Sequence, residues 1–102
     1  MYGFKGLKIW VDDLRPAPEG YEWCKNFRSA IATIICFALY EGGIDILDLD
    51  HDLGDGQSGY DIAKYLVEND INIGTIRVHS MNPVGKKNIE QLLTRYHYHV
   101  EI

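Results

Sequence analysis

The chain has 102 residues, of which 46% are apolar and 25% are charged, and its formal net charge is −5. This length and balance are typical of one globular domain with a single core, and the negative charge argues against a broad nucleic-acid-binding surface. No apolar run approaches the roughly 20 residues that a membrane-spanning helix needs. We therefore expect a single domain over residues 1–102 that neither spans a membrane nor binds nucleic acid broadly.

The two cysteines and residues 1–8 indicate the cellular compartment of the protein. Cys24 and Cys36 lack the Cys-x-x-Cys spacing of a zinc site, so free thiols in a reducing compartment are expected. Residues 1–8 show no signal-peptide pattern. Together these features predict a cytoplasmic protein.

The first half of the chain predicts two strands, a stiff loop and a helix. Residues 7–13 have a strand pattern that ends in two acidic residues. Residues 14–20 contain two prolines and a glycine, which exclude a helix and predict a stiff loop. Residues 21–26 alternate apolar with polar side chains and predict a short strand at an edge. A helix is expected over residues 27–40, stopped by the glycines at positions 42 and 43.

The second half predicts three strands and two helices. Residues 44–50 form an apolar run typical of a buried central strand. Ser58 and Asn82 are good N-cap residues for helices that end near residues 70 and 96. Strands are expected at residues 74–80 and 97–102. Strands that alternate with helices through short loops predict an α/β fold, with a mostly parallel sheet of four or five strands and helices on both faces as a three-layer sandwich.

Polar side chains follow three of these strands. Because the carboxyl ends of parallel strands meet at one edge, where ligands bind in such sheets, we expect these side chains to share one pocket. They are Asp12-Asp13 after the first strand, Asp50-His51-Asp52 after the central strand, and His79-Ser80-Met81-Asn82 after the next.

The acidic residues at this edge predict a metal site. Asp12, Asp13 and Asp50 offer the hard oxygen ligands that suit Mg²⁺, Mn²⁺ or Ca²⁺. A cation also offsets the repulsion between crowded carboxylates. An imidazole from His51 or His79 extends the choice toward Mn²⁺, Fe or Zn²⁺ and leaves a second metal open. We expect a divalent cation, most simply Mg²⁺ or Mn²⁺.

The neighbouring polar residues predict proton transfer and anion binding. Histidine side chains can exchange protons at neutral pH, so His51 and His79 are candidate catalytic acids or bases, with Asp52 beside them. Ser80 and the amides after Asn82 lie at a helix N-terminus and form a candidate anion cradle.

Three further side chains are candidates for substrate binding. Arg15, on the stiff loop, can clamp a phosphate through two N–H groups. Lys86 follows the anion cradle and can assist it. Tyr60 opens a helix beside the acidic loop and is a candidate platform for a base or a ribose.

Structural roles compete with these functional ones. His79 can be a core histidine bonded to a backbone carbonyl. Ser80 and Asn82 can serve only as a helix cap, and Arg15 can simply pair with the first acidic pair. The sequence does not choose between these roles.

The pattern of acids resembles the receiver domain of two-component signalling. An acidic pair follows the first strand, an aspartate ends the central strand and a serine follows the next, at Asp12-Asp13, Asp50 and Ser80. The resemblance implies a flavodoxin-like fold in which these acids hold Mg²⁺ and Asp50 accepts a phosphoryl group. Two features differ: a Pro-rich loop replaces the first helix, and residues 97–100 read HYHV in place of the late Lys-Pro.

A more specific resemblance is to the cyclic-phosphate processing receiver domains. It is carried by WVDDLRPAP (residues 10–18), LDHDLG (49–54), GYD (59–61) and VHSMNPVG (78–85). The resemblance implies a metal-dependent phosphodiesterase that opens a cyclic phosphate on a small nucleotide or an RNA end, in settings of RNA repair or of conflict between phages and bacteria.

Two functions stay open at this point. In the first, the chain is an enzyme in which the acids hold a metal and a histidine moves the proton. In the second, it is a non-catalytic module that binds Mg²⁺ and a phosphorylated ligand, or is phosphorylated on Asp50, and signals to a partner. A homodimer is compatible with both, and a degenerate domain that only docks a partner is a third possibility.

Overall fold

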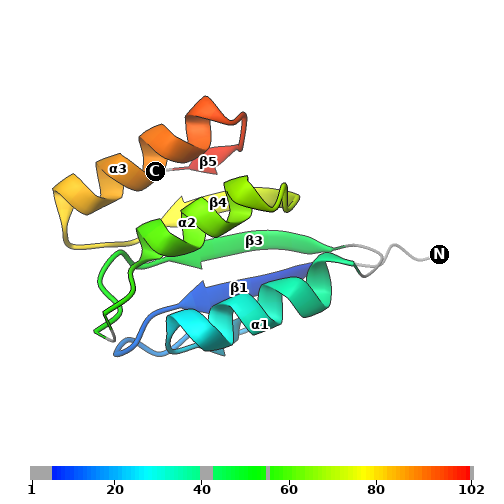
Figure 1. Ribbon diagram of the computed structural model, residues 1–102. Helices are drawn as coiled ribbons and strands as arrows, with labels where there is room; N and C mark the ends of the chain where they lie inside the picture. The colour runs from blue at the N-terminus through cyan, green and yellow to red at the C-terminus, as the bar shows by residue number, and fades with distance from the viewer. Residues whose placement is uncertain (1–5, 40–42, 55, 102) are drawn as a thin grey trace.

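The computed structural model describes residues 6–39, 43–54 and 56–101 of the chain. In these ranges the elements are β1 (Leu7–Val11), β2 (Glu22–Cys24), α1 (Phe27–Ala38), β3 (Ile44–Leu49), α2 (Gly59–Glu68), β4 (Ile73–Val78), α3 (Pro83–Arg95) and β5 (Val100–Glu101). All five strands are parallel and form one sheet in the order β2-β1-β3-β4-β5 (Figure 1). The predicted α/β fold with a mostly parallel sheet is confirmed.

Element bounds differ from the prediction mainly at the strand ends. The strand expected at residues 21–26 covers only Glu22–Cys24, because Asn26 caps α1 and its side chain accepts a hydrogen bond from the Ser29 N–H at 2.8 Å. The last strand is likewise reduced to Val100–Glu101. Residues 40, 42 and 102, on which the expected ends of α1 and β5 depend, lie outside the described ranges.

The predicted caps of α2 and α3 are confirmed. The Ser58 hydroxyl accepts from the Asp61 N–H at 3.4 Å, and the Asp61 carboxylate accepts from the Ser58 N–H at 2.8 Å, which is a capping box. Asn82 Oδ1 accepts from the Gly85 N–H at 2.9 Å, with Pro83 as the first helical residue. These caps start α2 and α3 close to the ends of β3 and β4.

The core lies between the sheet and the helices. Its fully buried side chains are Ile9, Val11, Ala30, Ile34, Leu47, Leu49, Ile62, Ala63, Leu66, Ile76, Ile89 and Leu93. Each helix contributes to this core from one face, whereas Ile35 of α1 and Leu39 at its end are exposed. Among the described helices, none has the length and apolar character needed to cross a bilayer.

The strand register brings three strand ends to the same height. Val11 pairs with Leu49, and Leu49 pairs with Val78. The next residues continue the ladder: the Asp50 N–H donates to the Val11 carbonyl and the His79 N–H to the Leu49 carbonyl, both at 2.9 Å. The residues that follow β1, β3 and β4 therefore leave the sheet side by side.

The three helices cover one face of the sheet (Figure 1). α1, α2 and α3 connect β2 to β3, β3 to β4 and β4 to β5, and these crossovers all run in the same direction across the sheet. Right-handed crossovers in one direction place their helices on one face. The connection in the opposite direction, from β1 to β2, is the Pro-rich loop. The described residues therefore form two layers, where a three-layer sandwich with helices on both faces was expected.

Candidate metal and phosphate site

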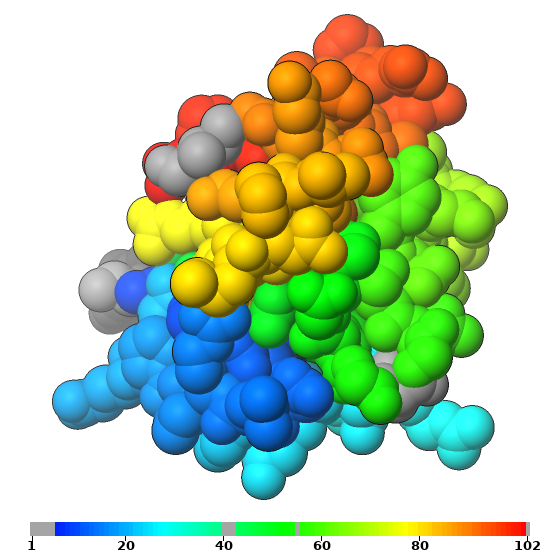
Figure 2. All heavy atoms as spheres, turned by 90° about the vertical axis from the view of Figure 1, so that its left-hand side faces the viewer, coloured from blue at the N-terminus to red at the C-terminus, as the bar shows by residue number. Residues whose placement is uncertain are grey.

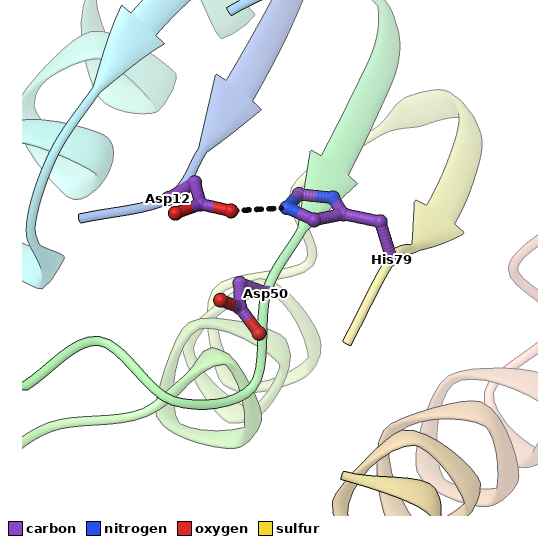
Figure 3. Close-up of side chains that lie close together, drawn as sticks. All are labelled: Asp12, Asp50 and His79. Carbon is purple, nitrogen blue, oxygen red and sulfur yellow. Dashed lines mark hydrogen bonds and ion pairs between the residues drawn. The ribbon is translucent and has the colours of Figure 1, made fainter. Parts of the chain in front are cut away.

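Asp12, Asp50 and His79 meet at the carboxyl edge of the sheet, directly after β1, β3 and β4 (Figure 3). Two carboxylate oxygens and one imidazole nitrogen, one from each residue, lie within 4.8 Å of one another. Asp12 is 1% exposed and Asp50 is 6% exposed. The expected convergence of the three strand exits is present in the structure.

Asp12 is an ionised carboxylate held by four contacts. Its Oδ1 accepts from the backbone N–H groups of Leu14 and Arg15, both at 2.8 Å. Its Oδ2 lies 3.0 Å from Arg15 Nε and 3.0 Å from His79 Nε2. Burial by itself raises the pKa of Asp12. The two backbone hydrogen bonds, the bond with His79 and the charge of Arg15 together lower it by more, so the pKa lies below its ordinary value.

His79 is held on three sides. Its Nδ1 lies 2.6 Å from Asp48 Oδ1, and its Nε2 faces Asp12, as the dashed line in Figure 3 shows. The ring stacks on the indole of Trp10, with the ring centroids 3.8 Å apart and the planes 2° from parallel. A histidine fixed in this way presents Nε2 to the centre of the group in one orientation.

Asp48 is a site residue that sequence reasoning missed. It lies in β3, is 8% exposed, and pairs in the sheet with Trp10 on one side and Arg77 on the other. The available signal was an aspartate near the end of a buried strand that reads IDILDL, because a buried carboxylate must have a partner. That partner is the imidazole of His79.

Arg15 bridges the two carboxylates of the group. Its Nε lies 3.0 Å from Asp12 Oδ2, and its Nη2 lies 3.4 Å from Asp50 Oδ2. Asp50 is also fixed through Oδ1, which accepts from the Asp52 N–H at 3.4 Å. The Arg15 side chain is 46% exposed, so its guanidinium lies at the open side of the group, where an incoming anion can reach it.

The donor set fits a divalent cation. Asp12 and Asp50 supply hard oxygen atoms, and His79 supplies an imidazole nitrogen whose other nitrogen is bonded to Asp48. A carboxylate bound to the far nitrogen of a metal-ligating histidine is a common feature of metal sites. Two oxygens and one nitrogen suit Mn²⁺ and also accept Mg²⁺.

The sequence also matches a known family. The family model of the cyclic-phosphate processing receiver domain matches residues 7–95. The chain belongs to this family. In the searches of curated proteins and of solved structures, nothing matches the chain.

Asp13 of this receiver domain is not one of the three residues whose ligand atoms lie within 4.8 Å of one another. Among the described residues, the metal-competent group contains His79 where Asp13 was expected beside Asp12 and Asp50. Asp13 instead lies against Gly54 of the loop after β3, and a Cβ atom added to Gly54 would come within 2.7 Å of Asp13 Oδ2.

His51 and Asp52 lie beside the group, on the helix side of the edge. The His51 ring packs on the first turn of α3, where a Cβ atom added to Gly85 would come within 2.7 Å of Nδ1. His51 Nδ1 lies 3.0 Å from Asp52 Oδ1, and the Asp52 side chain is 66% exposed. The two residues form an acid–histidine pair that is separate from the Asp12, Asp50 and His79 group.

Ser80 and Asn82 are engaged in starting α3. The Ser80 hydroxyl accepts from the Asn82 N–H at 3.0 Å, and Asn82 is the N-cap. Lys86 follows on α3 and is half-buried. Tyr60 is partly buried against the core and lines a pocket between α2 and α3, which His51 also lines.

Proposed function

We propose that this domain hydrolyses cyclic phosphates, on small nucleotides or at RNA ends, in a reaction that requires a divalent cation such as Mg²⁺ or Mn²⁺. The observation that carries the proposal is the buried group of Asp12, Asp50 and His79. Membership of a cyclic-phosphate processing family supports the substrate class.

Asp12, Asp50 and His79 Nε2 would hold the cation. Bound there, the cation would supply Lewis-acid stabilisation of the phosphate charge and activation of a water molecule. The low pKa of Asp12 keeps this carboxylate ionised at neutral pH. Asp48 keeps His79 Nε2 directed at the same position through the bond to Nδ1.

Arg15 is placed to bind the phosphate. Its half-exposed guanidinium already lies against both carboxylates of the group. On substrate binding it would exchange the longer contact, 3.4 Å to Asp50, for the non-bridging oxygens of the phosphate. A guanidinium can bind two such oxygens at once, which fixes the orientation of the phosphate.

His51 is the best placed residue for proton transfer. Hydrolysis adds water to phosphorus and breaks one ring P–O bond; the released ribose oxygen takes up a proton, and the product is a monoester. His51 Nδ1 is paired with Asp52, which leaves Nε2 as the nitrogen that exchanges a proton. His79 is less suited because both of its nitrogens contact carboxylates.

The test is turnover of 2′,3′-cyclic nucleotides with Mn²⁺ or Mg²⁺, followed by ³¹P NMR as the cyclic diester becomes a monoester. We expect Asp50→Asn and His79→Ala each to lower kcat/KM by about 100-fold or more, and chelation of the cation to abolish turnover. Asp45→Asn, an exposed position in the same strand as Asp48, is the matched control and should retain full activity.

The absence of turnover with every metal would overturn the proposal. If acetyl phosphate then labelled Asp50, the domain would instead be a receiver-type module. Turnover that survives both site variants would place the chemistry elsewhere in the chain.

A further inference from the structure

We infer that the pocket between α2 and α3 binds the nucleoside part of the substrate, an inference that rests on the proposed function. The pocket has a volume of about 470 Å³, which lies in the range typical of small-ligand sites. Its polar lining comes from the loop after β3, the start of α2 and one face of α3, at His51, Ser58, Tyr60, Asn88, Gln91 and Arg95.

The pocket reaches the residue that follows Asp50 in the chain. His51 lines the pocket and is the residue after Asp50, so their Cα atoms are about 3.8 Å apart. The first turn of α2 is packed on the same backbone: the Gly59 N–H donates to the His51 carbonyl at 2.8 Å, and a Cβ atom on Gly59 would lie 3.1 Å from the Asp50 carbonyl carbon.

The view onto the carboxyl edge agrees with this arrangement. In Figure 2, the green segment near residues 50–60 lies between the blue loop after β1 and the gold start of α3. A ligand whose phosphate lies on Asp12, Asp50 and His79 thus has its remaining atoms next to the segment that forms the pocket wall.

The lining has the chemistry to recognise a nucleoside. Asn88 and Gln91 lie one turn apart on α3, and their amides can donate to and accept from the edge of a base. Tyr60 and Leu92 supply apolar surface for a ring. Arg95 adds N–H groups that can donate to the acceptors of a base or a ribose.

Two further pockets among the described residues lack this connection. One lies along α1, is lined mainly by apolar side chains such as Ile31 and Ile35, and includes Arg28. The other lies near residues 70–74 and 96–99, at the end of the sheet away from the metal-competent group. Of these three pockets, the one between α2 and α3 includes a residue adjacent in sequence to a member of that group.

The test compares a nucleotide with a cyclic phosphate that has no base. The double variant Asn88→Ala, Gln91→Ala should raise KM for 2′,3′-cyclic nucleotides about tenfold with little change in kcat, and leave KM for ethylene phosphate unchanged. Arg28→Ala on α1 is the matched control. Equal effects on both substrates, or no effect on either, would overturn the inference while leaving the proposed function intact.

A second measurement does not depend on turnover. Titration of the protein with a nucleoside 3′-monophosphate should shift the side-chain amide NMR signals of Asn88 and Gln91, and Arg95→Ala should weaken that binding about tenfold. If hydrolysis were absent but these signals shifted, the pocket would still be assigned as a nucleoside site and only the proposed reaction would be wrong. If the signals stayed in place at millimolar ligand, the pocket assignment would be wrong.

Discussion

An imidazole has two ring nitrogens, and in His79 each of them faces a different carboxylate. Nδ1 lies 2.6 Å from Asp48 and Nε2 lies 3.0 Å from Asp12, with the ring stacked on Trp10. Asp48 belongs to β3, whereas Asp12 follows β1 and is one of the three residues that could hold a cation. Asp48 therefore fixes the ring, and the contact of Nε2 with Asp12 is the one that a ligand can replace.

This arrangement predicts that Asp48→Asn weakens metal binding without removing a metal ligand. An amide is a poorer acceptor for the Nδ1 proton and can favour the other tautomer, so we expect Mn²⁺ affinity to fall about 10- to 100-fold. Isothermal titration calorimetry measures the affinity, and a thermal melt checks that the variant folds. Asp45→Asn should bind Mn²⁺ as the unaltered chain does, and a normal affinity for Asp48→Asn would show that Asp48 has no part in the site.

At the scale of elements, the start of α3 is shaped around His51. Gly85 is buried in the first turn, next to the N-cap bond of Asn82, and the space for a side chain at Gly85 is taken by the His51 ring. The start of α3 needs a glycine at position 85, because the loop after β3 packs the His51 imidazole against it.

A double-mutant cycle tests this contact. Gly85→Ala in the unaltered chain should lower the free energy of unfolding by about 1–3 kcal/mol, because the new methyl group overlaps the ring. In a His51→Ala background the same change should be neutral or stabilising by up to about 1 kcal/mol, because alanine favours a helix. Urea unfolding measures both; equal effects in the two backgrounds would show that the ring does not limit this position.

At the scale of the whole molecule, the carboxyl edge divides its polar residues between the two sides of the sheet. Asp48 and His79 lie with Trp10 on the side away from the core, because they alternate with buried residues such as Leu49 and Val78. His51 lies on the helix side, against α3. The metal-competent group and the pocket between α2 and α3 thus lie at the same edge, with the residues after β3 between them.

Asp12 links this edge to the stability of the whole domain. Its pKa in the folded chain lies below the ordinary value of 3.8, so its contribution to stability is fully present above that value and is lost as the pH falls through the lowered pKa. We expect the urea midpoint to fall as the pH drops below about 4, and Asp12→Asn to be less stable at pH 7 but to show a smaller fall. Asp45→Asn, an exposed control, should keep the full pH dependence; if Asp12→Asn kept it too, Asp12 would not be responsible.

Much of the fold and part of the site followed from local patterns in the chain. Apolar periodicity, the capping residues Ser58 and Asn82, and the loop prolines locate strands, helices and breaks, because each depends on residues a few positions apart. Parallel strands end at one edge, so the meeting of Asp12, Asp50 and His79 could also be expected.

Other features depend on how distant strands and helices pack. The meeting of His79 with Asp12 and Asp50, the pairing of Asp48 with His79, and the turn of His51 toward α3 follow from strand register and helix position. The placement of all helices on one face follows from the strand order. A local pattern shows that a polar residue leaves a strand, but its partner comes from residues tens of positions away, and only packing brings the two together.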